Sequence, residues 1–284
     1  MGLFLEVKIS DGLGNQMFQY AAARSLCIKN KITYLLLNIE SFNTNSVGRT
    51  FKLNHFKIKG NIIENSFFKK LLRQNSKYNN FISKLSVYKY ISEETLTLRN
   101  LSSEAAFFTS IKGYWQSEYY FKDIRPQLLE EFVPLEIPVF PDWIKYKNTV
   151  AVHIRRGDYK TENSLGILDV RYYFAAIHMI NNSINNPLFV FFSDDINWCK
   201  TTFKANNIIF CEEKEWQADY HQLFLMSKCA HQIIANSSFS WWAAWLNQNP
   251  DKIVIRPQSP FANSALMYES YYPETWTTAS NYIN

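Results

Sequence analysis

The sequence has few of the residues that usually build metal sites and disulfide frameworks. Its four cysteines, Cys27, Cys199, Cys211 and Cys229, are far apart and show no Cys-x-x-Cys spacing, which argues against a zinc site and against a dense disulfide network. The five histidines are dispersed, with no His-Glu-x-x-His pattern. We therefore expect reduced thiols, as in a cytosolic protein, and no metal site.

Long apolar runs are also missing. The longest apolar stretches span only a few residues, whereas a membrane-crossing helix needs about 20. The first residues, Met1 to Ile9, include Glu6 and Lys8 and lead into a glycine turn, so they do not predict a signal peptide. We expect a cytoplasmic protein whose contact with the membrane, if any, is peripheral and at its inner face.

Several motifs of phosphate and hydrolytic chemistry are absent. No Gly-x-x-x-x-Gly-Lys loop occurs, which disfavours a kinase or sulfotransferase, and no Gly-x-Ser-x-Gly pattern occurs. There is no Asp-x-Asp pair of the kind that holds Mn²⁺ or Mg²⁺ in many sugar-nucleotide enzymes. The net charge of +5 comes without a dense stripe of lysine and arginine, so nucleic acid is not an expected partner. An anionic small molecule or an acidic membrane surface fits this charge better.

Length and proline content predict two domains. A chain of 284 residues, 47% of them hydrophobic, suits two domains of roughly 100–150 residues each. Pro134, Pro138 and Pro141 cluster in the middle of the chain and disfavour regular elements there. We set the boundary near 133–148, giving an N-terminal α/β domain at 1–140 and a C-terminal α/β domain at 141–284, whose last helix is expected to pack back on the first domain.

Apolar periodicity predicts alternating strands and helices in both halves. In the first half, Phe4–Ile9 and Ile32–Leu37 are expected strands joined through a helix, Phe107–Trp115 is strand-like and Tyr119–Phe132 helical, while 41–100 has no clear pattern. In the second half the expected strands are Thr149–Ile154, Leu188–Phe192, Ile208–Cys211, Gln232–Ala235 and Lys252–Ile255. Helices are expected from Arg171, Ile196, Ala218 and Phe239. This alternation favours parallel sheets in two α/β domains with a cleft between them.

The densest group of charged residues follows the strand Thr149–Ile154, where His153 leads into Arg155, Arg156, Gly157 and Asp158. Open α/β sheets bind ligands at the carboxyl ends of their strands. Guanidinium forks bind phosphate oxygens bidentately, and glycine lets the backbone approach a ligand closely. The motif therefore predicts a site for a doubly charged anion. The alternatives are a surface charge pair or, for His153, an ordinary core histidine; nothing supports a secreted Arg-Gly-Asp adhesion loop.

Three further segments join a strand end to a helix start. Gly12, Gly14 and Asn15 form a turn whose free N–H groups suit a diphosphate, with Asn15 as a candidate helix cap, although many helix starts use such residues for geometry alone. Asp194 and Asp195 are placed to accept hydrogen bonds from a nucleotide, or one of them caps the helix from Ile196. A third reading, metal chelation, is disfavoured by the spacing.

The last such segment runs from Asn236 to Trp242. Ser238 is the expected helix cap, and the serine hydroxyls together with unpaired N–H groups suit phosphate oxygens. Trp241, Trp242 and Trp245 are more consistent with core packing than with ligand contacts.

Taken together, these motifs resemble those of the α-1,2-fucosyltransferases of glycosyltransferase family 11, in particular the bacterial members. The resemblance lies in five segments that occur in the family's order: Gly12 to Tyr20, Gly113 to Ser117, His153 to Tyr159, Phe192 to Asp195 and Asn236 to Trp242. The least matched stretch is roughly 43–101, where acceptor specificity would be expected to reside.

The resemblance implies a GT-B fold, with two Rossmann-like domains facing each other across a cleft, and inverting transfer of L-fucose from GDP-fucose without a metal or other cofactor. The acceptor would be the 2-hydroxyl of a terminal galactoside, in an oligosaccharide or lipid-linked glycan such as an O-antigen or capsule repeat. Carried over by motif, the catalytic residue would be Arg155, on the β-phosphate. The other expected GDP contacts are Gly12, Gly14, Asn15, His153, Arg156, Asp194, Asp195, Asn236, Ser237, Ser238 and Phe239.

The general base for the acceptor hydroxyl is not fixed by the sequence. Asp158 and Glu162 closely follow the arginine motif and are both candidates, although Asp158 could instead pair with an arginine or hold the loop. Two other functions stay open: a GDP-sugar transferase with another linkage or a peptide acceptor, and a non-catalytic module that binds a nucleotide sugar.

Overall fold

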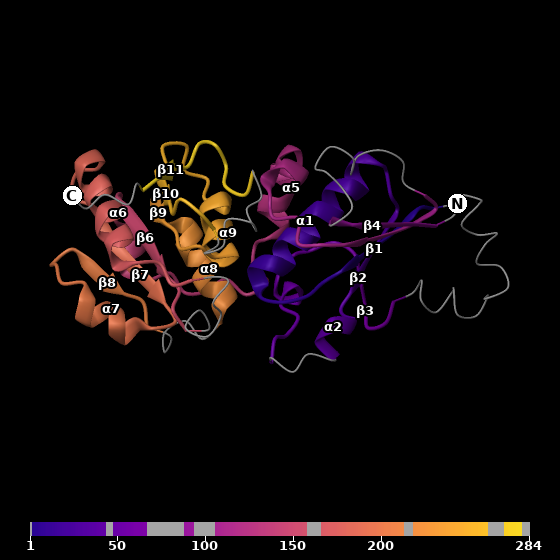
Figure 1. Cartoon of the computed structure of the whole chain (residues 1–284), viewed down its shortest axis with the longest axis horizontal. Helices are drawn as coiled ribbons and strands as arrows, with labels where there is room; N and C mark the ends of the chain where they lie inside the picture. Colours follow the sequence, from indigo (N-terminus) through magenta and orange to yellow (C-terminus); the bar gives the residue numbers. More distant parts are fainter. Residues whose placement is uncertain are drawn as a thin grey trace. The chain divides into compact units, whose positions relative to one another are not determined.

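The computed structural model describes residues 2–43, 48–66, 88–93, 106–157, 166–212, 218–260 and 270–279. The chain divides into two compact units, Met1–Leu135 and Glu136–Asn284, so the division lies in the proline-rich stretch between Pro134 and Pro138. Each unit has its own parallel β-sheet with helices packed on it (Figure 1). This is the GT-B type of architecture, built from two Rossmann-like α/β domains.

The sheet of the first unit has five strands in the order β3-β2-β1-β5-β4 within the described residues, and every neighbouring pair is parallel. The strands are β1 (Phe4–Lys8), β2 (Tyr34–Asn38), β3 (Asn61–Ile63), β4 (Tyr88–Ser92) and β5 (Phe108–Lys112). Helix α1 (Leu13–Lys29) connects β1 to β2 and packs on both. The predicted βαβ start is therefore confirmed, with β2 shifted by two residues at its beginning.

Among the described residues, the rest of the first unit consists of short elements. They are α2 (Glu40–Asn43), η1 (Leu53–His55), η5 (Glu118–Tyr120), η6 (Lys122–Ile124) and α5 (Arg125–Glu131). The prediction of one helix over Tyr119–Phe132 was wrong, because two 3₁₀ turns precede α5. Pro126 lies in the first turn of α5, where its missing N–H costs nothing, but its ring would clash with the preceding turn of a longer helix.

The second unit has a six-stranded parallel sheet in the order β11-β10-β9-β6-β7-β8 within the described residues. Read from β8, this is the 3-2-1-4-5-6 order of doubly wound nucleotide-binding folds. The strands are β6 (Thr149–Ile154), β7 (Leu188–Ser193), β8 (Ile208–Phe210), β9 (His231–Ile233), β10 (Val254–Arg256) and β11 (Thr277–Thr278). The helical elements are η7 (Asp142–Lys145), α6 (Val170–Ser183), α7 (Ile196–Thr202), α8 (Asp219–Lys228) and α9 (Ser238–Leu246).

Strand β6 is the centre of the second unit. All six of its residues are buried, and its core neighbours include Tyr172, Tyr173 and Ile180 of α6, which lies along the sheet in Figure 1. The tryptophans of α9 also pack in the core, as predicted: Trp241 and Trp242 are fully buried and Trp245 nearly so. A rigid, two-sided core thus fixes the position at which β6 ends, immediately before the arginine motif.

All four cysteines lie in the described part of the chain, are buried, and form no disulfide with one another. Burial raises the pKa of Cys199 to about 11 and that of Cys229 to about 12, so these thiols stay protonated at neutral pH. Buried, protonated thiols of this kind are unreactive.

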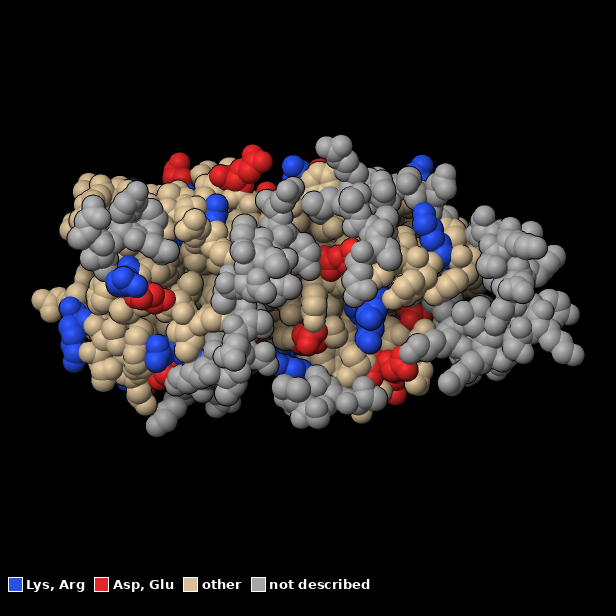
Figure 2. Space-filling model, in the orientation of Figure 1, with Lys and Arg blue, Asp and Glu red and all other residues tan. Residues whose placement is uncertain are grey.

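No helix among the described residues is both long and apolar enough to cross a membrane. On the face drawn in Figure 2, basic and acidic side chains of the described residues are interspersed rather than gathered by sign. The predicted closing helix lies outside the described residues, which end at Ala279 with β11 as their last element.

Candidate functional site

The second unit brings two of the predicted motifs to its topological switch point. Strand β6 has β7 on one side and β9 on the other, so the order of the sheet reverses beside it. Ligands of open α/β sheets bind outside the carboxyl ends of the strands at this point. Arg155, Arg156 and Gly157 follow β6, while Asn236, Ser237 and Ser238 follow β9, and these six residues therefore occupy the position expected for a ligand site.

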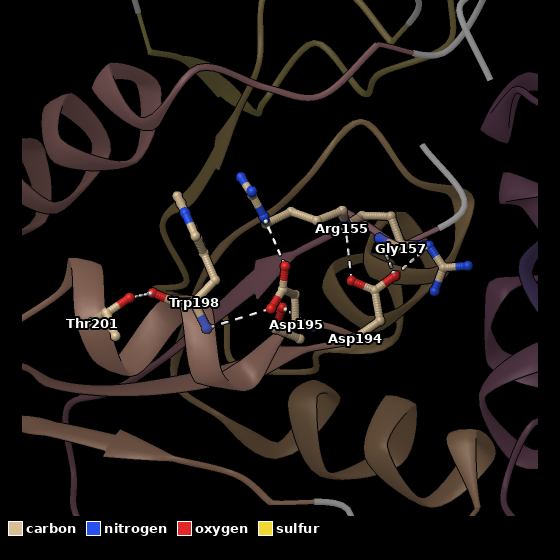
Figure 3. A network of polar contacts seen from close by, with 8 residues as sticks. Arg155, Gly157, Asp194, Asp195, Trp198 and Thr201 are labelled. Atoms are coloured by element: carbon tan, nitrogen blue, oxygen red, sulfur yellow. Dashed lines mark hydrogen bonds and ion pairs between the residues drawn. The ribbon is translucent and has the colours of Figure 1, made fainter. Parts of the chain in front are cut away.

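The carboxylate of Asp194, directly after β7, holds the loop that follows β6 (Figure 3). Its Oδ1 accepts a hydrogen bond from the backbone N–H of Arg156 at 2.9 Å. Its Oδ2 accepts from the backbone N–H of Gly157 at 3.0 Å and forms an ion pair with Nε of Arg155 at 3.2 Å. Both oxygens thus fix the path of the arginine loop, and one of them also restrains the Arg155 side chain.

Gly157 is needed for this contact because the loop and the carboxylate approach so closely. A Cβ atom at position 157 would lie 2.8 Å from Oδ2 and 3.2 Å from Cγ of Asp194, closer than side chains normally pack. The motif therefore needs glycine at position 157, because a side chain there would collide with the carboxylate of Asp194. Any larger residue must displace either the backbone N–H or the carboxylate that receives it.

Arg156 is held separately, by Asp195 and by an aromatic ring. Its Nε lies 3.2 Å from Oδ2 of Asp195, and its Cζ lies 3.9 Å from the centre of the Trp198 ring, a cation–π contact. Asp195 also caps α7, since its Oδ1 accepts from the backbone N–H of Trp198 at 3.4 Å. The prediction that one aspartate of the pair caps this helix is confirmed.

Trp198 is a site residue that the sequence reasoning missed. The sequence did contain a signal for it: Trp198 lies in the first turn of α7, three residues after the cap Asp195. A capping side chain bonds to the N–H groups of this turn, so Trp198 lies close to any group that Asp195 binds. An arginine sandwiched between a carboxylate and an indole has few accessible rotamers. Arg156 therefore contributes a fixed positive charge beside Arg155.

His153, the last residue but one of β6, is buried and uncharged at neutral pH. Burial, and secondly the positive charge of Arg155, lower the pKa of His153 to about 3. Its ring lies 5.4 Å from that of Phe239 in α9, centre to centre, so it links the ends of β6 and β9. Within the described part of the chain, no group hydrogen-bonds its buried Nδ1.

The segment after β9 is built as a helix cap, but by a different serine from the one predicted. Ser237, not Ser238, is the N-cap of α9: its backbone is extended and its Oγ accepts from the N–H of Phe239 at 3.3 Å. Ser238 is already the first helical residue. Asn236 donates from Nδ2 to the carbonyl of Gly166 at 3.0 Å, which ties this segment to the residues that precede α6.

The glycine turn lies at the corresponding place in the first unit, because β1 has β2 on one side and β5 on the other. Gly12 is the N-cap of α1 and has no side chain to satisfy the first helical N–H groups. The expectation that Asn15 caps this helix was wrong: its backbone N–H already bonds to the carbonyl of Gly12 at 2.9 Å, inside the first turn. Its side chain is thereby released for another contact.

Gln16, the next residue, anchors the turn. Its Nε2 donates to the carbonyls of Asp11 at 2.7 Å and Thr50 at 2.9 Å, while its Oε1 accepts from the N–H of Lys52 at 2.9 Å. The side chain is fully buried and satisfies all these partners at once. Asp11 has a φ of 65°, a region that aspartate tolerates better than most residues, so the turn is tight and rigid.

The predicted site residues thus fall into two groups. The second unit gathers His153, Arg155, Arg156, Asp194, Asp195 and Phe239, with Asn236, Ser237 and Ser238 at the neighbouring strand end; the first unit holds Gly12, Gly14 and Asn15. Asp158 and Glu162 lie outside the described residues, so their roles stay predictions. Among the described residues, no group of three or more histidine, cysteine, aspartate or glutamate side chains could hold a metal ion.

The profile of glycosyl transferase family 11 matches residues 2–280, nearly the whole chain. The chain belongs to glycosyl transferase family 11. It is therefore a glycosyltransferase, and the resemblance noted from its five motifs is confirmed.

Two Escherichia coli members of glycosyl transferase family 11 are similar over most of their length. The O-antigen biosynthesis glycosyltransferase WbnK is 34% identical, covering 90% of this chain and 94% of its own. An α-1,2-colitosyltransferase is 31% identical, covering 95% and 96% respectively. The mouse galactoside 2-α-L-fucosyltransferase Sec1 is more distant, at 24% identity over 96% of this chain and 73% of its own.

Solved structures share the fold at much lower sequence identity. The α-1,6-fucosyltransferase NodZ, co-crystallized with GDP, superposes with a TM-score of 0.50 at 11% identity, covering 86% of this chain and 92% of NodZ. A mutant of Arabidopsis thaliana FUT1 in complex with GDP gives a TM-score of 0.50 at 9% identity, covering 98% and 76%. These similarities show that the chain shares the two-domain fold of these enzymes.

Proposed function

We propose that this family 11 enzyme transfers L-fucose from GDP-fucose to the 2-hydroxyl of a terminal galactoside, with inversion at the fucose anomeric carbon. The acceptor is a surface glycan such as an O-antigen or capsule repeat. The names of its relatives support this assignment, since they include an O-antigen glycosyltransferase, an α-1,2-colitosyltransferase and a galactoside 2-α-L-fucosyltransferase.

The observation that carries the proposal is the pair of arginines at the carboxyl end of β6. Arg155 and Arg156 are each oriented by one carboxylate, Asp194 or Asp195, and the backbone of their loop is held by two further hydrogen bonds. Fixed positive charge costs no reorganisation when a diphosphate leaves. In the proposal Arg155 binds the β-phosphate, and Arg156 supplies a second, more strongly restrained charge.

Neighbouring groups at the same sheet edge supply the other contacts. Ser238, Phe239 and the helix start that Ser237 caps line the phosphate side, with Asn236 beside them. His153 and the Asp194–Asp195 pair lie next to the guanosine. From the first unit, the proposal assigns Gly12, Gly14 and Asn15 to the diphosphate, with Asn15 donating from its side-chain amide.

The reaction is then a direct displacement through an oxocarbenium-like transition state. Arg155 stabilises the negative charge that develops on the departing GDP. A general base removes the proton of the acceptor 2-hydroxyl. Asp158 and Glu162, which follow the arginine loop in sequence, are the two candidates for this role.

No metal ion is required in this proposal, because the arginines neutralise the leaving diphosphate. The test is transfer in the presence of EDTA: turnover that survives extensive chelation is expected, and loss of turnover restored by Mg²⁺ or Mn²⁺ would overturn it.

Peripheral contact with the membrane would follow from a lipid-linked acceptor, and co-sedimentation with anionic vesicles measures it directly.

A second donor is favoured by one specific observation, the 31% identity to an α-1,2-colitosyltransferase over 95% of this chain. Colitose is fucose without the 3-hydroxyl. The same GDP site and the same α-1,2 linkage would therefore suit either donor. Competition between GDP-fucose and GDP-colitose at equal concentration separates them, since only the preferred sugar accumulates in the product.

The overall test is an acceptor screen with product analysis. The enzyme is incubated with GDP-fucose and a panel of galactose-terminated oligosaccharides, and the linkage of any product is determined by NMR. An α-1,2-fucosylated galactoside is the expected product. Another linkage, or tight binding of GDP with no transfer to any acceptor of the panel, would contradict the proposal.

A further inference from the structure

The segment from Gly113 to Ser117 is one of the five family motifs, yet the proposed function gives it no role. It follows β5, whose neighbours in the sheet are β1 and β4. The carboxyl ends of these three strands therefore lie side by side, with Glu93 after β4, this segment after β5 and the glycine turn after β1. A chain of hydrogen bonds crosses all three.

The chain begins at Glu93, whose carboxylate is bound by two successive backbone N–H groups. Tyr114 donates to Oε2 at 2.6 Å and Trp115 donates to Oε1 at 3.0 Å. Gly113 permits the close approach, since a Cβ there would lie 2.5 Å from Cβ of Glu93. The segment after β5 is thus fixed through its backbone, independently of the side chains it presents.

Trp115 adds a costly backbone conformation to this arrangement. Its φ is 55°, which bulky residues rarely adopt, and its side chain is fully buried, with its ring edge-on to that of Tyr120 at 5.3 Å. Strained residues of this kind persist where the surrounding structure forces them, and they cluster at functional sites. The consequence of this turn is the direction of the next side chain, Gln116.

Gln116 is nearly buried, and its Nε2 donates to Oδ1 of Asn15 at 2.8 Å. An amide that accepts through its oxygen must direct its nitrogen elsewhere. Within the described part of the chain, no group accepts a hydrogen bond from Nδ2 of Asn15. Asn15 therefore offers only donors on its remaining side, the polarity that the start of an α-helix generally presents.

We propose that Gln116 is a positioning residue, which locks the Asn15 amide so that its Nδ2 donates to the diphosphate of the GDP-sugar. The inference rests on the proposed function, which assigns Asn15 to the diphosphate. Without Gln116 the amide would rotate freely and would present its oxygen to the anion part of the time. The motif after β5 then exists to set the polarity of one side chain in the glycine turn.

The test is a double-mutant cycle on GDP affinity, measured by titration calorimetry with the full chain. Asn15→Ala removes the donor, and Gln116→Met removes the lock without changing charge or size appreciably. Each single variant should weaken GDP binding by about tenfold or more, as expected for a hydrogen bond to a charged group. The double variant should bind GDP no more weakly than Asn15→Ala alone, because Gln116 acts only through Asn15.

Two controls separate this role from general damage to the loop. Tyr114→Phe removes the hydrogen bond from the Tyr114 hydroxyl to Oδ2 of Asp11, 2.8 Å long, and leaves the Asn15–Gln116 contact in place. GDP affinity should stay within about twofold of wild type, since this contact is exposed and involves neither Asn15 nor Gln116. The affinity for guanosine, which lacks the diphosphate, should be the same in every variant.

The outcomes distinguish the inference from the function on which it rests. Losses that add up in the double variant would overturn the inference, because Gln116 would then act on its own. Unchanged GDP affinity in Gln116→Met, with a loss in Asn15→Ala, would overturn it as well and leave Asn15 in its role. Unchanged affinity in Asn15→Ala would remove the diphosphate role of Asn15 and the inference together, whereas unchanged affinity in Arg155→Ala would contradict the proposed function itself.

Discussion

The two strand-end loops of this enzyme are rigid for different reasons. In the second unit, the loop after β6 is held by charge, since Asp194 and Asp195 each pair with an arginine. In the first unit, the segment after β5 and the turn after β1 meet through the neutral amides of Asn15 and Gln116, and Trp115 has a strained backbone. The loop of the second unit is thus held through charged groups and the segment of the first unit through neutral amides.

This difference suits the chemistry of a leaving diphosphate. Negative charge grows on GDP during the reaction, and a full positive charge gains more stabilisation from that growth than a neutral donor does. Neutral amide donors bind the ground state and the transition state more equally, so they mainly secure affinity and orientation. We therefore expect the two loops to differ in how strongly they affect turnover, in their response to salt and in their response to pH.

The largest effect is expected for Arg155→Ala. Removal of the charge that stabilises departing GDP should lower kcat/KM by about a thousandfold. The matched control is Arg171→Ala on α6, which also loses an ion pair with an aspartate, Asp169, but at an exposed surface position. Steady-state kinetics with a saturating galactoside acceptor measure both. An Arg155→Ala enzyme with a rate close to wild type would remove the basis of the proposed mechanism.

Asp194→Asn should have the next largest effect, although both arginines of the proposed phosphate site stay in place. The amide keeps one acceptor oxygen and turns its NH₂ group toward N–H donors of the loop, so the backbone at Arg156 and Gly157 has to shift. Small displacements of catalytic groups cost about a hundredfold in rate. Asp169→Asn, another aspartate beside an arginine, is the control and should leave kcat/KM unchanged.

The buried His153 should make the second unit sensitive to acid. Its pKa is about 3 in the folded protein and about 6.5 when unfolded, so between these values only the unfolded chain takes up the proton. Stability therefore falls as pH drops below about 6.5, by at most about 1.4 kcal/mol per pH unit for this one group. Urea unfolding at pH 7 and pH 5 should show a smaller pH effect in His153→Gln than in wild type; equal effects would contradict the burial of a neutral ring.

Salt should produce the smallest effect and the sharpest contrast between the two loops. The arginine pairs are 20–28% exposed, so ions partly screen them. Raising ionic strength should reduce the factor by which Arg155→Ala weakens GDP binding, by about two- to fivefold. The factor for Asn15→Ala should stay constant, because it reflects a neutral donor. Equal salt dependence of the two factors would contradict the claim that Arg155 acts through its charge and Asn15 as a neutral donor.

Much of the second unit could be predicted from the sequence because its signals are local. The apolar run Thr149–Ile154 is buried on both faces, and the observed strand has these same bounds. The capping role of Asp195 follows from an acidic residue directly before a helix. The predicted cap of α9, Ser238, was wrong by one residue, since adjacent serines have equal propensity and only the backbone conformation identifies Ser237 as the cap.

The first unit was less predictable because its contacts connect distant segments. Glu93 lies in a polar stretch without periodicity, and its partners Tyr114 and Trp115 are 21 and 22 residues away. Gln116 and Asn15 are separated by 101 residues. Asn15 was predicted to be a helix cap because asparagine favours that position, but the N-cap of α1 is Gly12. Capping propensity depends on residues that are close in sequence, whereas the contacts of Asn15 and Gln116 depend on segments that the fold brings together.

The most direct test of the central claim compares GDP with guanosine as ligands of wild type and Arg155→Ala. The ratio of the two dissociation constants isolates what the diphosphate contributes to binding. The account predicts a large ratio in wild type, a fall of about a hundredfold in Arg155→Ala and an unchanged affinity for guanosine. A ratio that is the same in both proteins would contradict the claim that the arginine loop after β6 binds the diphosphate.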